Sequence, residues 1–381
     1  MRPCLPRLLE YLEQILDPSR QAHISELYEK ALNWEPVPRL PLVLSYALPS
    51  DFPFQPLPVK QTFDGPEKML YNELVYAFNA SIACRGQLDD DLPCTIRANF
   101  GTVIMASMFG GKIEQSGDSP PWVRQFETIG EFRRILDIDP LDFSKGWCPA
   151  VIETYEFYQR QLSDYPVLRE SVQVVLPDLQ GPLDTAELLR GSRIYEDFYE
   201  DEGTLSKVLN HIALAQVGFA RHLQPLLNDG PTGYSHQHMA MIRGGILIRD
   251  DCAINISPTT YRQHIAPHDA FVLEAMGGGG IHCCGKFEHL VEEFLGLPGL
   301  KCIDLGQPEL NEVDSIYRKA RRRKIPLIRV RADEGQLISG RVVERFPTGV
   351  TLAHTAKSLG EAQLIMKAYK AASQVRNSTS S

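Results

Sequence analysis

The chain has 381 residues, of which 43% are hydrophobic and 23% charged, as in an ordinary globular protein. This length allows one large domain with an extension, or two ordinary domains. The net charge of −9 argues against a general nucleic-acid-binding role. No apolar run reaches the ~20 residues that a membrane-spanning helix needs, so we expect no membrane partner.

The cysteines and the start of the chain predict where the protein resides. The eight cysteines are scattered without the spacing of a disulfide framework. The first residues lead into a segment dotted with acidic side chains, which is unlike the apolar core of a secretory signal. We therefore expect reduced cysteines and a cytoplasmic protein.

Apolar residues at three- and four-residue spacing predict helices over residues 5–33. We assign residues 1–35 to an N-terminal helical extension and residues 36–375 to one main domain. The polar residues 376–381 are predicted to form a disordered tail.

The main domain alternates predicted strands with predicted helices, which favours an α/β fold with a parallel sheet. The strand near residue 244 is expected to run from Met239 to Ile248, and residues 110–128 are expected to be loop. Eight βα units over about 340 residues predict a (β/α)8 TIM-like barrel. A doubly wound open sheet is the alternative, but no G-x-G-x-x-G follows an early strand. The eight strands are expected near residues 43, 97, 174, 244, 281, 303, 328 and 351.

The segment MGGGGIHCCG, residues 276–285, is the first candidate for a functional site. Strand side chains alternate with period two, so His282 and Cys284 are expected on the same side. An imidazole and a thiolate are two of the ligands that zinc prefers. The alternative is a buried turn with two inert cysteines, because free cysteine is among the most buried residue types. Without zinc, His282 is a candidate proton donor or acceptor oriented by Asp250 or Asp304.

In a barrel, active residues lie at the carboxyl ends of the strands. Polar residues gather at these positions along the chain. They are Asp89 to Asp91 or Asn99, Asp178 with Gln180, Arg249 with Asp250 and Asp251, His282 with Cys284, Asp304 with Gln307, Arg331, and His354.

Two segments carry a resemblance to a known family. Residues 178–191, DLQGPLDTAELLRG, resemble the Gly-Pro strand-to-helix signature of the uroporphyrinogen decarboxylase superfamily. Residues 250–285 resemble its later part, in which a helix runs into His-x-Cys-Gly in the methyltransferase branch. The arginine-rich signature of true decarboxylases is missing, because Arg39 is the only arginine in residues 34–65. Their late Gly-His-Gly is replaced by Thr348-Gly349-Val350.

The resemblance is therefore closer to the zinc methyltransferases that move a methyl group between a corrinoid protein and a thiol. In that branch, zinc is bound by the His-x-Cys pair and by a later cysteine. His282 and Cys284 match the pair, but Gly349 stands at the place of the later cysteine. His354, five residues on, is our predicted third ligand, with Cys302 and His238 as alternatives.

The resemblance implies a corrinoid-linked methyltransferase with a zinc site, acting with a corrinoid protein or a small methyl donor or acceptor, as a monomer or homodimer. A decarboxylase of the uroporphyrinogen type and a non-catalytic barrel that binds a tetrapyrrole or corrinoid are the alternatives. The predicted residues are Asp91, Asp251 and His282 for catalysis, Arg97, Gln180, Arg249 and Asp250 for substrate binding, and His282, Cys284 and His354 for the metal.

Overall fold

The structure is a computed structural model that describes residues 4–229, 233–237 and 239–379. Its main sheet has six parallel strands in the order β1-β12-β11-β10-β9-β8. The bounds of these strands are β1 Leu42–Ser45, β8 Ile246–Arg249, β9 Gly279–Cys283, β10 Leu300–Leu305, β11 Leu327–Arg331 and β12 Val350–Thr355.

Three smaller pairs of strands complete the sheet structure. β2 (Thr95–Ile96) and β5 (Gln173–Val174) pair in parallel. Two antiparallel hairpins are formed by β3 (Lys112–Glu114) with β4 (Trp122–Arg124) and by β6 (Tyr234–Gln237) with β7 (Ala240–Arg243). Among the described residues, no ladder joins β1 to β2 or β5 to β8. Strand pairing thus defines an α/β protein with a mostly parallel sheet.

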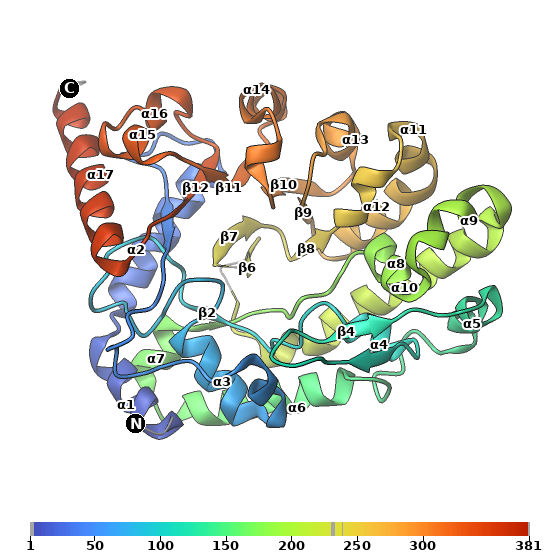
Figure 1. The fold of residues 1–381 in the computed structure, drawn as a ribbon. Coiled ribbons are helices and arrows are strands. Elements are labelled where there is room, and N and C mark those ends of the chain that lie inside the picture. Colours follow the sequence, from blue (N-terminus) through green and yellow to red (C-terminus); the bar gives the residue numbers. More distant parts are fainter. Residues whose placement is uncertain (1–3, 230–232, 238, 380–381) are drawn as a thin grey trace.

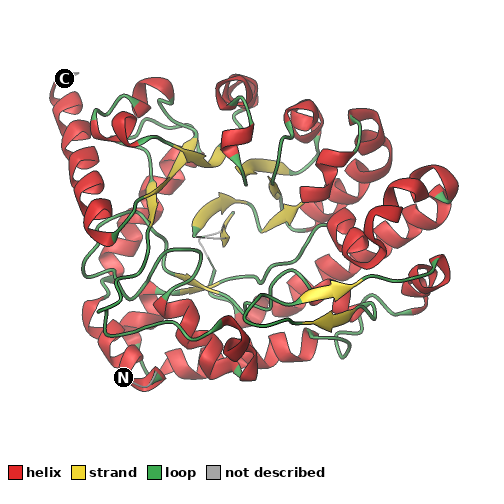
Figure 2. Cartoon of the chain, in the orientation of Figure 1, coloured by secondary structure: helices red, strands yellow, loops and turns green. Residues whose placement is uncertain are grey.

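The α-helices lie on the outer side of the arc that the strands follow (Figures 1 and 2). None of the described helices is long and apolar enough to cross a lipid bilayer. Their bounds are α1 Leu5–Ile15, α2 Pro18–Leu32, α3 Pro66–Val75, α4 Ile104–Met108, α5 Ile129–Arg133, α6 Cys148–Ser163, α7 Pro166–Ser171, α8 Pro182–Arg190, α9 Ile194–Glu200, α10 Glu202–Leu223, α11 Pro258–Thr260, α12 Ala266–Ala275, α13 Val291–Gly296, α14 Val313–Arg323, α15 Glu334–Ile338, α16 Val342–Arg345 and α17 Leu359–Thr379.

The hairpin of β6 (Tyr234–Gln237) and β7 (Ala240–Arg243) lies on the inner side of the arc (Figure 1). Its apolar side chains pack with α2 and with the inward side chains of β8, β10 and β11. We call this group the inner cluster, and its buried members are Ile24, Tyr28, Leu32, Ala240, Met241, Ile242, Leu247, Cys302 and Ile328.

Each of the eight expected strand positions carries a strand or lies within a few residues of one. The predicted strand from Met239 to Ile248 is instead two strands, β7 and β8. Gly244 separates them with a φ of 90°, and a Cβ there would lie 2.3 Å from the backbone of Gly278. Only glycine fits this turn, and the continuous apolar pattern concealed it. The predicted loop over residues 110–128 contains a hairpin of β3 (Lys112–Glu114) and β4 (Trp122–Arg124).

The helices near the two ends of the chain contact the rest of the fold. α1 buries Leu5, Leu8 and Leu12 in the main core, and α2 also packs on β12. The backbone of α17 is helical as far as Thr379, beyond the start of the predicted tail at residue 376.

The register of the main sheet places three polar side chains in one row. Arg249 on β8 pairs with His282 on β9, and His282 pairs with Asp304 on β10. Neighbours in a parallel register point to the same face, so all three point inward, toward the side of the inner cluster. This row is the base of the candidate site.

Candidate metal centre

Glycines bring His282 into position. α12 ends at Ala275, and Gly277 and Gly278 turn the chain into β9 with φ values of 75° and 98°. A Cβ at Gly280 would lie 2.6 Å from the sulfur of Cys302, so a side chain there would push β9 away from β10. The glycine run thus allows a sharp turn and a close approach of two strands.

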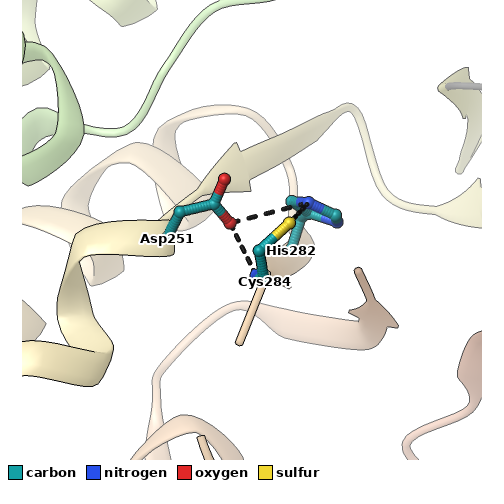
Figure 3. A group of neighbouring side chains, drawn as sticks. All are labelled: Asp251, His282 and Cys284. Carbon is teal, nitrogen blue, oxygen red and sulfur yellow. Dashed lines mark hydrogen bonds and ion pairs between the residues drawn. The ribbon is translucent and has the colours of Figure 1, made fainter. Parts of the chain in front are cut away.

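Three side chains with metal-binding atoms converge at the end of β9 (Figure 3). One ligand atom each from Asp251, His282 and Cys284 lie within 4.8 Å of one another. The Nε2 atom of His282 is 3.4 Å from Cys284 Sγ and 3.6 Å from Asp251 Oδ1. Nitrogen, sulfur and oxygen donors of these types are the ligands that zinc takes in proteins.

Asp251 is held in this position by the helix after the Gly-Pro motif. The carboxylate of Asp184, on α8, accepts hydrogen bonds from the backbone N–H groups of Asp251 and Cys252, both at 2.9 Å. Burial, followed by the nearby charge of Asp251, raises the pKa of Asp184 to about 7. Asp251 in turn accepts a 2.6 Å hydrogen bond from the backbone N–H of Cys284. Its side chain is 41% exposed, so an ion or ligand can reach it.

On the other side of the imidazole, His282 is fixed by a carboxylate. His282 Nδ1 lies 2.8 Å from Oδ2 of Asp304, which is itself fully buried. Arg329 donates to both oxygens of Asp304, through Nε at 2.7 Å and through a terminal nitrogen. Burial alone would raise the pKa of Asp304, but the charges of Arg329 and His282 hold it well below its usual range. A carboxylate behind a metal-binding histidine orients the ring and raises its basicity.

The sulfur of Cys284 is a neutral thiol in the protein alone. Burial and the neighbouring Asp251 raise the pKa of Cys284 to about 12. A metal bound here would have to displace the thiol proton, so its affinity would rise with pH.

A cavity of about 310 Å³ lies beside the centre, and its lining includes Gly306. A Cβ at this position would lie 2.6 Å from Cys284 Sγ and 2.8 Å from His282 Cε1. Gly306 therefore packs directly against these two side chains, and only a residue without a side chain fits there. We call this space the Gly306 cavity, whose lining includes Val43, Leu305, Arg329, Arg331 and His354.

The predicted third ligand, His354, does not lie at the centre. Asp251 is the third candidate ligand there instead. His354 Nδ1 lies 2.8 Å from the carbonyl oxygen of Ala332, and its ring lines the Gly306 cavity. Cys302 is buried in the inner cluster beside Gly280, two residues before Asp304. His238 lies outside the described residues.

The predicted substrate-binding residues Arg97, Gln180 and Arg249 gather around one carboxylate, Asp178. Arg249 Nε is 2.9 Å and Arg97 Nη1 3.4 Å from its oxygens. Gln180 donates to it at 2.6 Å. All four side chains are buried, and the cluster adjoins the row that contains His282.

Asp250 is not part of that cluster and does not orient His282. Its fully buried side chain lies beside Asp269, which accepts a 2.6 Å hydrogen bond from Tyr261. Burial first, and then the charge of Asp269, raise the pKa of Asp250 well above its usual value. Two carboxyl groups this close share a proton instead of both ionising.

Asp91 lies at the opposite end of the strands. Its backbone N–H donates to the carbonyl of Leu42, the first residue of β1, at 2.9 Å. Arg39 donates to both carboxylate oxygens. Asp91 therefore forms a structural ion pair at the amino end of β1, whereas the candidate metal ligands lie at the carboxyl ends of β8 and β9. In the sequence, nothing in the run of three aspartates distinguishes a structural ion pair from a functional site.

Sequence reasoning missed Arg329 and Gly306. Arg329 lies within β11 and Gly306 directly follows β10, but a single arginine and a single glycine do not form a recognisable sequence motif. The nearest available signal for Gly306 was its place directly after β10, next to Asp304 and Gln307.

No protein-family model matches this sequence, and no curated protein sequence does. Among solved structures, the chain is similar to a methyltransferase from Methanosarcina mazei, with a TM-score of 0.58 and 14% sequence identity. The similarity covers 94% of this chain and 99% of that one. At this identity, the likeness concerns the fold alone.

Proposed function

We propose that this chain is a zinc methyltransferase that passes a methyl group between a corrinoid held by a partner protein and a thiol. The observation that carries the proposal is the convergence of Asp251, His282 and Cys284, whose ligand atoms lie within 4.8 Å. The fold shared with the Methanosarcina mazei methyltransferase supports it.

We infer that the six-stranded sheet and the β2–β5 pair are two parts of one (β/α)8 barrel. A backbone hydrogen bond spans each of the two gaps between them. Asp91, just before β2, donates its N–H to Leu42 of β1, and Gly181, after β5, donates its N–H to Arg249 of β8, both at 2.9 Å. In such a barrel, the carboxyl ends of all eight strands open on one mouth, where barrel enzymes bind their substrates.

The residues present fit a zinc ion in three respects. They offer three ligands of the right types, a carboxylate behind the histidine, and at Gly306 a close backbone contact with two of the ligands that a Cβ would not allow. When bound, a zinc ion with three protein ligands keeps one open position, at which a thiol loses its proton at neutral pH. In this proposal, the Gly306 cavity, which lies beside the centre, binds the substrate thiol.

Metal content tests the centre directly. We expect about one zinc ion per chain in protein purified without a metal-affinity tag, and loss of zinc in Asp251→Ala, His282→Ala and Cys284→Ala. His354→Ala is the matched control, because His354 lies on the same cavity but outside the three ligands, and it should keep its zinc. A zinc-free parent protein would contradict the proposal.

Activity is tested with methylcobalamin and a panel of thiols, by following the loss of the methyl-cobalt absorbance. We expect turnover in the parent protein and none in Cys284→Ala. Turnover of uroporphyrinogen instead would establish the decarboxylase alternative. Tight corrinoid binding without turnover of either substrate would establish the non-catalytic one.

A further inference from the structure

Arg329 occupies an inserted position in β11. Leu327 and Val330 both pack into the main core, and Ile328 packs into the inner cluster on the opposite side. Strict alternation would place residues 327 and 330 on opposite faces. The pairing with β12 shifts between them, because Leu327 pairs with Val350 and Val330 with Leu352. Two residues of β11 therefore oppose one residue of β12, which defines a β-bulge.

The bulge turns the side chain of Arg329 inward. Its backbone has a φ of 57°, a left-handed conformation that is strained for an arginine. The opposing residue, Thr351, is buried, and its hydroxyl oxygen accepts the backbone N–H of Arg329 at 3.0 Å. This hydrogen bond replaces the missing ladder bond and stabilises the inserted residue.

The inward guanidinium donates two hydrogen bonds to Asp304, one to each carboxylate oxygen. A two-pronged pair of this kind fixes the orientation of the carboxylate as well as its position. Without Arg329, Asp304 could rotate about its last bond. The same terminal nitrogen of Arg329 lies 3.0 Å from His282 Nδ1, so Arg329 contacts both members of the Asp304–His282 pair.

The tautomer of His282 depends on this geometry. A neutral imidazole has one N–H and one lone pair, and the hydrogen bond at one nitrogen decides which is which. If Nδ1–H donates to Asp304, then Nε2 carries the lone pair and faces Cys284 Sγ and Asp251 Oδ1. If Arg329 donates to Nδ1 instead, the proton lies on Nε2, and that atom cannot bind a metal.

We propose that Arg329 is a positioning residue whose bulge locks Asp304 so that His282 keeps its proton on Nδ1 and presents the Nε2 lone pair to the metal centre. Asp304 is the preferred acceptor because it is an anion at 2.8 Å, and Arg329 already donates to it. The inference rests on the proposed function only in taking Nε2 as the metal-binding atom. The tautomer itself is a property of the metal-free protein.

The test is the ¹⁵N NMR spectrum of the histidine rings in metal-free protein at mildly alkaline pH, with His282 assigned by its loss in His282→Gln. The parent protein should show protonated Nδ1 and unprotonated Nε2. Arg329→Met removes the donor near Nδ1 but also frees Asp304 to rotate away from Nδ1–H, while Asp251 Oδ1 stays 3.6 Å from Nε2, so protonation should shift toward Nε2. Arg329→Lys, which keeps the charge but makes one contact instead of a fork, should give a mixture.

Arg331→Met is the matched control. Arg331 lies two residues on in the same strand and lines the same cavity, but it pairs with Glu309 at 3.4 Å. We expect the parent tautomer in this variant. Zinc affinity should fall by ~10–100-fold in Arg329→Met, the range for a partner behind a metal ligand, and stay unchanged in Arg331→Met.

The outcomes separate this inference from the proposed function. If the parent protein binds no zinc but Arg329→Lys still changes the tautomer, the proposed function fails and the inference stands. If Arg329→Lys has the parent tautomer, the inference is overturned, whatever zinc does. Should Arg329→Met fail to fold because Asp304 is left unpaired, the lysine variant decides the question alone.

Discussion

Two runs of aspartates in this chain look alike in sequence and differ in the structure. In the run Asp89-Asp90-Asp91, every carboxylate has a cationic partner: Arg20 and Lys370 for Asp89, Arg85 for Asp90, and Arg39 for Asp91. In the run Asp250-Asp251, the carboxylates face other acids, a histidine and a thiol. The first run joins the amino end of β1 to its surroundings, and the second lies at the carboxyl end of β8.

The difference shows how to recognise a site among acidic residues. Paired carboxylates are already neutralised, so they contribute to stability and attract no further cation. Carboxylates that face acids and neutral ligands carry uncompensated charge, which a metal ion or a shared proton can balance. The cationic partners of the first run come from residues 20, 39, 85 and 370, which no local pattern connects with it.

The largest expected effect is on the buried pair of the first run. Arg85→Met leaves Asp90 with an uncompensated charge, because both side chains are almost completely buried. We expect a loss of about 3–5 kcal/mol in the free energy of unfolding, measured by urea denaturation at neutral pH, with zinc content unchanged. The double variant Arg85→Met with Asp90→Asn should recover part of the loss. A single variant within about 1 kcal/mol of the parent would contradict the structural role of this run.

A substitution at Gly306 is expected to have a smaller effect on stability but to lower the zinc affinity of the centre directly. Gly306→Ala places a methyl group against Cys284 Sγ and His282 Cε1. Overpacking of this kind costs about 1–3 kcal/mol, and the displaced ligands should bind zinc more weakly. Gly296→Ala, where a Cβ meets nothing within 4 Å, is the control and should change neither property. Parent-like zinc affinity in Gly306→Ala would show that the contact with Gly306 does not set the positions of these two ligands.

Much of this arrangement could be predicted from the sequence, and the rest depends on pairing between distant segments. Strand positions follow from local apolar runs, and the same-side placement of His282 and Cys284 follows from the period of a strand. The approach of Asp251 to that pair needs the register of β8 against β9. The inward turn of Arg329 needs a bulge opposite Thr351, which alternation alone would have excluded. His354 lies on the wall of the Gly306 cavity, but the ring is held by Ala332 instead of facing the ligands.

Asp250 of the second run forms an acidic pair with Asp269, and this pair predicts a pH effect. Burial raises the pKa of Asp269 to about 6, from an ordinary value of 3.8. Between these two values the folded protein binds more protons than the unfolded chain, so the contribution of Asp269 to stability is lost as pH rises. Asp269→Asn keeps an acceptor for Tyr261 and removes the titration. Relative to the parent, we expect the variant to gain about 1 kcal/mol or more in unfolding free energy from pH ~4 to ~6, since one pKa unit corresponds to ~1.4 kcal/mol. A difference that does not change with pH would mean that the pair holds no shared proton.

The smallest effect should have the opposite sign, and it comes from the first run. Burial alone would raise the pKa of Asp89, but the hydrogen bond from Lys370 and the charge of Arg20 lower it below its usual value. Its contribution to stability is therefore present above the ordinary aspartate pKa and lost as pH falls through the folded one. Asp89→Asn should cost less than about 1 kcal/mol at neutral pH, because the side chain is 70% exposed and its ion pairs are screened by solvent. The cost should vanish in acid, whereas the gain from Asp269→Asn should vanish there for the opposite reason. Parallel pH profiles for the two variants would mean that the surroundings of the two runs do not differ electrostatically. The distinction between the paired run and the candidate metal-binding run would then have to rest on the exposure of the side chains alone.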